Sequence, residues 1–134
     1  MSNKISTVHK MYDCFAVGDV PGVLAIMSDD IHLDGGSDPK LTGFGGQFDG
    51  KEGATRFFTA IGTGIETTNF VASNLREEGG RVVNDILHEG IARPTGKPFS
   101  AKVRFSWGFN EAGQPNDWVG NGPGYDEIDR AFSN

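Results

Sequence analysis

The sequence predicts an α+β fold in which three N-terminal helices pack on a strongly curved antiparallel sheet, giving a cone with an internal pocket. Two observations support this fold class. Before Ile65, apolar residues recur at helical spacing in three segments, whereas after it they alternate or form β-prone stretches separated by turn signals. A run of helices followed by a run of strands is typical of an α+β domain.

Size and composition indicate one domain over residues 1–134 and a small-molecule partner. The chain is 37% hydrophobic and 22% charged, and no apolar run approaches the roughly 20 residues that a membrane span needs. Residues 1–6 show no secretory signal, so a cytoplasmic location is expected. The net charge of −6 argues against nucleic-acid and anionic-membrane surfaces, which require clustered Lys and Arg.

The helices are predicted from their apolar faces and their caps. The first carries Val8, Met11, Tyr12, Phe15 and Ala16 and ends at Gly18. Asp19 is expected to cap the second helix, with Pro21 in its first turn, where a missing N–H does no harm. Asp49 and Glu52 resemble a capping box that opens the third helix.

Five strands and one long loop are expected after the second helix. A short strand over residues 31–34 precedes a glycine-rich loop over residues 35–50, which carries Phe44 and Phe48. The later strands are expected at residues 66–76, 81–92, 99–109 and 116–120. In the segment 99–109, aromatic and apolar residues alternate strictly with polar ones, so one face of this strand meets an apolar interior.

The hairpin between the second and third long strands sets which side chains point inward. If Thr95 and Gly96 form a two-residue loop, the facing pairs are Ala92 with Phe99, His88 with Val103, Ile86 with Phe105 and Asn84 with Trp107. Glu89 then faces Lys102 on the outer surface, a favourable pair. This register points Asn84 and His88 into the apolar interior.

Several short sequence segments carry a resemblance to a known family. They are YDCFAVGDV (12–20), MSDDI (27–31), GKEG (50–53) with Phe57 and Phe58, GRVV (80–83), TGKPF (95–99) and FNEAG (109–113). Together with the order of elements, they resemble the SnoaL-like proteins of the nuclear-transport-factor-two-like superfamily, which includes ketosteroid isomerase, polyketide cyclases and limonene epoxide hydrolase. The resemblance implies a pocket between the concave sheet face and the helices, and a homodimer through the convex face.

The catalytic residues of these relatives do not carry over. The isomerase's general base falls at Gly35, its oxyanion-hole tyrosine at Met11 and its oxyanion-hole acid at Phe105. The acid that cyclases usually carry on the last strand has no counterpart in residues 118–124. The Asp-Arg-Asp arrangement of the epoxide hydrolase is also missing, because Arg104 lies on the expected outer face.

Two residues are candidates for acid/base chemistry. His88 titrates near neutral pH, and Asp34 ends the first strand where helices and sheet converge. Each also has a structural interpretation, His88 as a hydrogen-bonded rim residue and Asp34 as a loop cap. The expected ligand-binding residues are Tyr12, Phe44, Phe58, Asn84, Ile86, Phe105, Trp107 and Asn121. No metal-ligand spacing and no phosphate-binding glycine pattern is present, so no cofactor is expected.

Two functions remain open from the sequence. One is a cofactor-independent isomerase, cyclase, lyase or hydrolase acting on a small hydrophobic carbonyl or epoxide compound, with His88 and Asp34 sharing acid/base roles. The other is a non-catalytic binding or carrier domain for a small apolar ligand. Geometry separates them, because catalysis needs at least two titratable groups within reach of one ligand atom.

Overall fold

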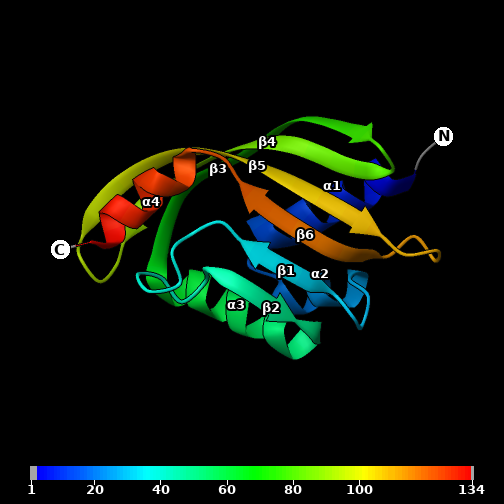
Figure 1. The fold of residues 1–134 in the computed structure, drawn as a ribbon, viewed down its shortest axis with the longest axis horizontal. Helices are drawn as coiled ribbons and strands as arrows, with labels where there is room; N and C mark the ends of the chain where they lie inside the picture. Colours follow the sequence, from blue (N-terminus) through cyan, green and yellow to red (C-terminus); the bar gives the residue numbers. More distant parts are fainter. Residues whose placement is uncertain (1–2, 134) are drawn as a thin grey trace.

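The computed structural model describes residues 3–133 and confirms an α+β architecture (Figure 1). Its elements are α1 (Asn3–Ala16), α2 (Val20–Ile26), β1 (His32–Gly35), β2 (Gly46–Asp49), α3 (Gly50–Gly64), β3 (Ile65–Glu78), β4 (Arg81–Ala92), β5 (Lys97–Phe109), β6 (Pro115–Asn121) and α4 (Gly124–Phe132). The three expected N-terminal helices are present. The short strand β2 lies within the segment that was expected to be a loop, and α4 was not expected.

The six strands form one mixed sheet in the order β2-β1-β6-β5-β4-β3. All neighbours are antiparallel except β1 and β6, which run parallel. The expectation of an all-antiparallel sheet was therefore wrong at this one pairing. β1 and β6 lie far apart in the chain, so no hairpin turn fixes their relative direction, which depends on how the helices return the chain to the sheet.

The β4–β5 register differs from the expected one by two residues. A four-residue loop, 93–96, joins the strands, and the Gly96 N–H donates to the Ala92 carbonyl at 2.7 Å. His88 consequently faces Ala101, and Asn84 faces Phe105. Because side chains alternate with a period of two, a two-residue shift leaves every inward side chain inward.

Of the two predicted N-terminal caps, that of α2 is present and that of α3 is not. The Asp19 carboxylate accepts from the Gly22 N–H at 3.0 Å, which confirms the cap of α2. Asp49 makes no cap hydrogen bond to α3, so that prediction was wrong. The β1–β2 register places Asp49 opposite His32, and its Oδ1 lies 2.6 Å from the His32 Nδ1.

Helix α4 occupies the edge that β6 leaves open. β6 pairs with β5 only from Arg104 onward, and α4 packs beside the first half of β5. The Thr95 hydroxyl donates to the Ala131 carbonyl, and the Asp38 N–H donates to both carboxylate oxygens of Asp129, at 3.1 and 3.2 Å. These contacts fasten α4 to the β4–β5 loop and to the segment between β1 and β2.

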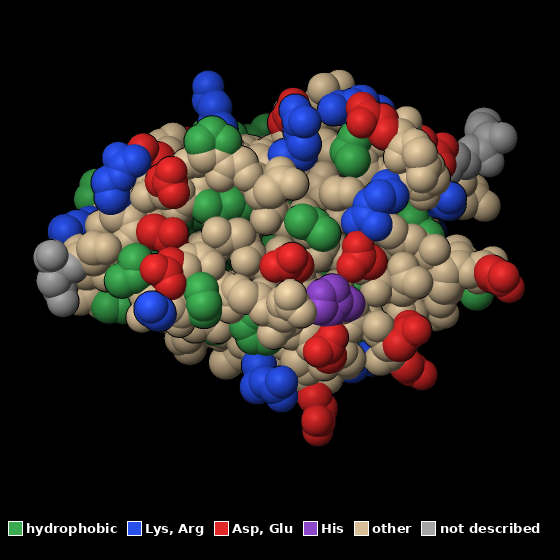
Figure 2. Space-filling model, viewed as in Figure 1, with side chains coloured by type: hydrophobic (Ala, Val, Ile, Leu, Met, Phe, Trp, Pro, Cys, Tyr) green, Lys and Arg blue, Asp and Glu red, His purple; other side chains and the backbone are tan. Residues whose placement is uncertain are grey.

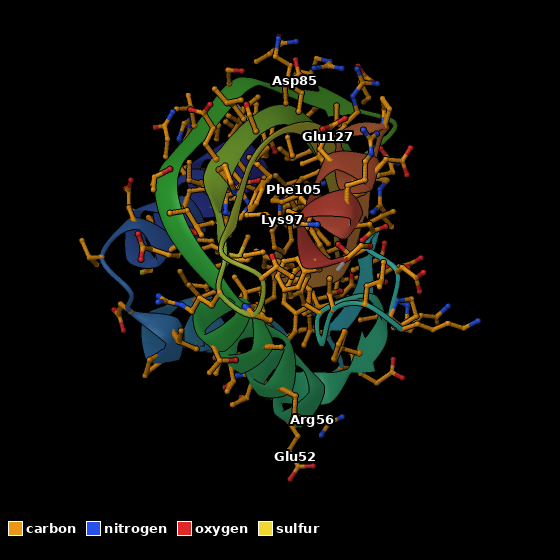
Figure 3. The ribbon with its side chains drawn as sticks, turned by 90° about the vertical axis from the view of Figure 1, so that its left-hand side faces the viewer. Glu52, Arg56, Asp85, Lys97, Phe105 and Glu127 are labelled. Atoms are coloured by element: carbon orange, nitrogen blue, oxygen red, sulfur yellow. The ribbon has the colours of Figure 1, made fainter. Side chains whose placement is uncertain are left out.

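The sheet curls around an apolar interior. Seen from the end, Phe105 points into the curl, Asp85 lies on the outside of the sheet, and Glu52 and Arg56 project from α3 into solvent (Figure 3). On the face shown in Figure 2, charged side chains of both signs are scattered, with apolar groups lying between them. None of the described helices has the length and apolarity needed to cross a bilayer.

Candidate functional site

A cavity of about 910 Å³ lies between the concave sheet face and helices α1, α3 and α4. Most of the chain's aromatic side chains line it. They are Tyr12, Phe15, Phe44, Phe57, Phe58, Phe70, Phe105, Trp107, Trp118 and Tyr125. Many of these rings meet edge to face, as Phe15 does with Phe58 at a centroid distance of 5.0 Å. The volume and lining are typical of a small-molecule site.

His88 is the titratable side chain on the inner wall of the sheet. It stands on β4 between Phe70 and Phe99, whose ring centroids lie 5.4 and 5.3 Å from its own. Its Nε2 lies 3.0 Å from the Thr67 hydroxyl oxygen. Burial among these rings lowers the pKa of His88 to about 4, because the charged imidazolium loses its hydration. The imidazole is therefore neutral at physiological pH.

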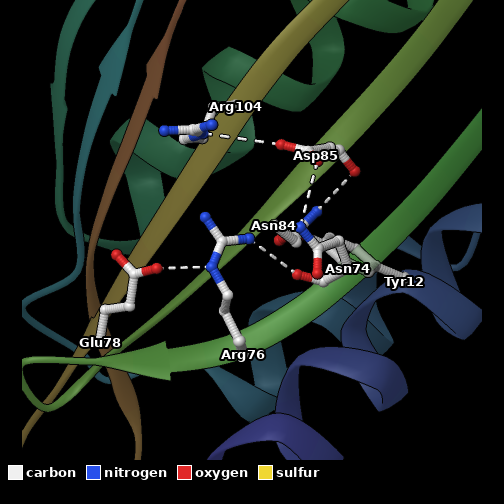
Figure 4. A network of polar contacts seen from close by, with 7 residues as sticks. All are labelled: Tyr12, Asn74, Arg76, Glu78, Asn84, Asp85 and Arg104. Carbon is white, nitrogen blue, oxygen red and sulfur yellow. Dashed lines mark hydrogen bonds and ion pairs between the residues drawn. The ribbon is translucent and has the colours of Figure 1, made fainter.

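Tyr12 forms the centre of a buried polar network. Its hydroxyl donates to the Asn84 Oδ1 at 2.8 Å and accepts from the Trp107 indole N–H at 3.0 Å. The Asn84 Nδ2 donates to the backbone carbonyl of Asp85 at 3.1 Å. Figure 4 shows the network continuing to the outer face, where Asp85 pairs with Arg104. Burial raises the pKa of Tyr12 above its ordinary value, although both hydrogen bonds act in the opposite direction.

The structure brings together part of the predicted site. Tyr12, Phe44, Phe58, His88, Phe105 and Trp107 all line the cavity. Asn84 and Ile86 point inward, as predicted, but they are covered by the surrounding core and do not line it.

Asp34 and Asn121 lie away from the cavity. Leu33 and Gly35 line the cavity from β1, and Asp34 between them points to the opposite face. Asn121 is exposed at the end of β6 and lines a separate outer groove. Neither residue is placed to share a ligand with His88.

Several lining residues were not among the predicted site residues. Tyr125 and Ile128 reach the cavity from α4, and Trp118 reaches it from β6. The spacing of Tyr125, Ile128 and Ala131, with Asp126 in the first turn, is a helix signal that the sequence contained. Burial raises the pKa of Tyr125 above its ordinary value.

Acidic side chains are sparse in the described lining of the cavity. Among the described residues that line the cavity, the one carboxylate is that of Asp13, which is exposed on α1. Among the described residues, no carboxylate forms a hydrogen bond or ion pair with His88. Within residues 3–133, no group of three or more His, Cys, Asp or Glu side chains could hold a metal ion.

Comparisons with known proteins point to one family. A family model for the SnoaL-like domain matches residues 8–114. The search of curated proteins gave no match. A solved NTF2-like protein of unknown function from Burkholderia pseudomallei is 25% identical, with a TM-score of 0.87 and 100% of both chains covered.

Two further solved structures show the same fold at lower identity. TerC, co-crystallised with polyporic acid, is 20% identical over 98% of both chains, with a TM-score of 0.83. A putative polyketide cyclase from Xanthomonas campestris is 17% identical over 98% of this chain and 97% of its own, with a TM-score of 0.75.

Proposed function

Because this chain belongs to the SnoaL-like domain family, we propose that it binds an uncharged, largely aromatic small molecule in its internal cavity. The observation that carries the proposal is the cavity wall, which contains ten aromatic side chains and the neutral imidazole of His88.

The size and surface of the cavity favour a ligand of several rings. A volume of about 910 Å³ is in the upper part of the range of small-molecule sites. Aromatic walls favour ring-bearing ligands, since edge-to-face and offset contacts add to the hydrophobic gain from burial.

The charges of the lining disfavour ionic ligands. Arg93 is the one lysine or arginine among the described lining residues; it is exposed, and its Nη1 lies 4.0 Å from the Glu66 carboxylate. A multiply charged ligand would lose its hydration inside without gaining a partner of opposite charge.

Two structural neighbours support a small-molecule ligand. The co-crystal of TerC contains polyporic acid, and another neighbour is described as a putative polyketide cyclase. Cyclase-type catalysis is a second candidate function here, favoured by one observation. His88 lies in the cavity lining with a neutral imidazole, so one ring nitrogen can accept a proton, but its lowered pKa makes it a weaker base than an ordinary histidine.

Calorimetric titration with a panel of uncharged fused-ring phenols and ketones tests the proposal. Ala72 lines the cavity from β3, whereas the adjacent Val71 is 45% exposed on the other face. Ala72→Phe should weaken binding by at least about tenfold, because it overfills the site. Val71→Phe is the matched control and should change the affinity by less than about twofold.

One result would refute the proposal, and another would separate binding from catalysis. Equal weakening by both substitutions would place the ligand outside the cavity and refute the proposal. Recovery of a chemically altered ligand, absent when His88→Gln replaces the wild-type protein, would favour catalysis over binding alone.

A further inference from the structure

We propose that Thr67 and His88 form the polar anchor of the cavity and select ligands that carry a hydroxyl group on an aromatic ring. This inference rests on the proposed function, because it specifies which member of the aromatic class the same cavity prefers.

A β-bulge places Thr67 beside His88. In the β3–β4 ladder, Phe70 faces His88, and simple alternation from Phe70 would turn Thr67 to the outer surface. The register shifts between Thr67 and Asn69, so Thr67 instead faces Gly90, on the inner side of β4. Gly90 has no side chain, and the Thr67 hydroxyl is free to reach the His88 Nε2 at 3.0 Å.

The second ring nitrogen of His88 is available to a ligand. Among residues 3–133, the His88 Nδ1 has no hydrogen-bond partner. It is also not one of the fully buried unpartnered atoms, so part of its surface is accessible. Phe70 and Phe99 flank the ring, and within the described part of the chain no charged side chain pairs with it. A ligand in the cavity can therefore meet a lone, accessible nitrogen on an aromatic wall.

The partner of Nε2 determines what Nδ1 can do. A neutral imidazole carries one proton, and the tautomer is set by the hydrogen bond that the other nitrogen makes. Imidazole side chains favour the proton on Nε2, and the Thr67 oxygen is placed to accept it. Nδ1 then keeps its lone pair and accepts a hydrogen bond, so the matching ligand group is a donor such as a phenolic hydroxyl.

A matched pair of ligands tests this directly on the wild-type protein. 2-Naphthol and 2-methoxynaphthalene have the same ring system, but only the first can donate. One hydrogen bond should make 2-naphthol bind about fivefold more tightly. In His88→Phe, this preference should disappear, so that the ratio of the two affinities falls to about one.

A spectroscopic readout separates anchoring from a structural role. The ¹⁵N chemical shifts of His88 report which ring nitrogen carries the proton. They should show the proton on Nε2 in the wild-type protein and a mixture of tautomers in Thr67→Val, with a smaller preference for 2-naphthol.

The possible failures are distinguishable. Equal affinity of the wild-type protein for both ligands, or a proton on Nδ1, would overturn this inference and leave the proposed function intact. Binding of neither ligand would count against both.

Discussion

Deleting the Tyr12 hydroxyl should destabilise the protein far more than deleting the hydroxyl of the cavity's other tyrosine. In Tyr12→Phe, the Trp107 indole N–H loses its acceptor and the Asn84 Oδ1 loses its donor. Asn84 is fully buried and Trp107 is 5% exposed, so water does not readily replace the lost partners.

The size of the effect follows from these two orphaned groups. Each buried polar group left unpaired costs about 1–3 kcal/mol. We therefore expect the free energy of unfolding to fall by about 3 kcal/mol, a large part of the roughly 5–15 kcal/mol typical of a domain. The corresponding decrease in Tm is about 10 °C.

Urea and thermal unfolding measure this change, with Tyr125→Phe as the matched control. Tyr125 is also a buried cavity tyrosine, but its hydroxyl has no hydrogen-bond partner among the described residues. Its deletion should change the free energy of unfolding by less than about 1 kcal/mol. If Tyr12→Phe is as mild as Tyr125→Phe, the polar network does not stabilise the core and the reasoning fails.

Three further predictions follow from the structure. The pKa of His88 is lowered from 6.5 to about 4, so the unfolded chain binds more protons between these values. Stability should therefore decrease as the pH falls through this range by on the order of 3 kcal/mol, and His88→Gln should remove that dependence in pH-resolved urea unfolding. Gly120→Ala should lower the Tm by several degrees and weaken ligand binding, because the new Cβ would lie about 2.8 Å from the Trp118 ring and collide with the Tyr125 hydroxyl. An unchanged Tm would show that α4 can shift to make room for the methyl group. On the outer face of β4, Val83, Leu87 and Ile91 alternate with Asp85 and Glu89, and this face is proposed to form a two-fold homodimer interface. Light scattering at tens of micromolar should therefore give the mass of a dimer, and Leu87→Lys should halve that mass. A monomeric wild-type protein would contradict this proposal.

The sequence by itself determined the elements whose signals are local. Strict alternation in the segment 99–109 and helical spacing near Tyr12 depend only on neighbouring residues, and the Asp19 cap acts across three positions. The inward direction of His88 was also predictable, because a register error of two residues preserves the face.

The tertiary structure alone decided which residues meet. The sequence does not reveal that β1 runs beside β6, and this pairing places Asp34 on the face opposite the cavity. Nor does it show the bulge that turns Thr67 toward His88, or the open edge of β5 that α4 fills. These features depend on contacts between segments far apart in the chain, whose geometry is set by packing of the whole core rather than by any local pattern.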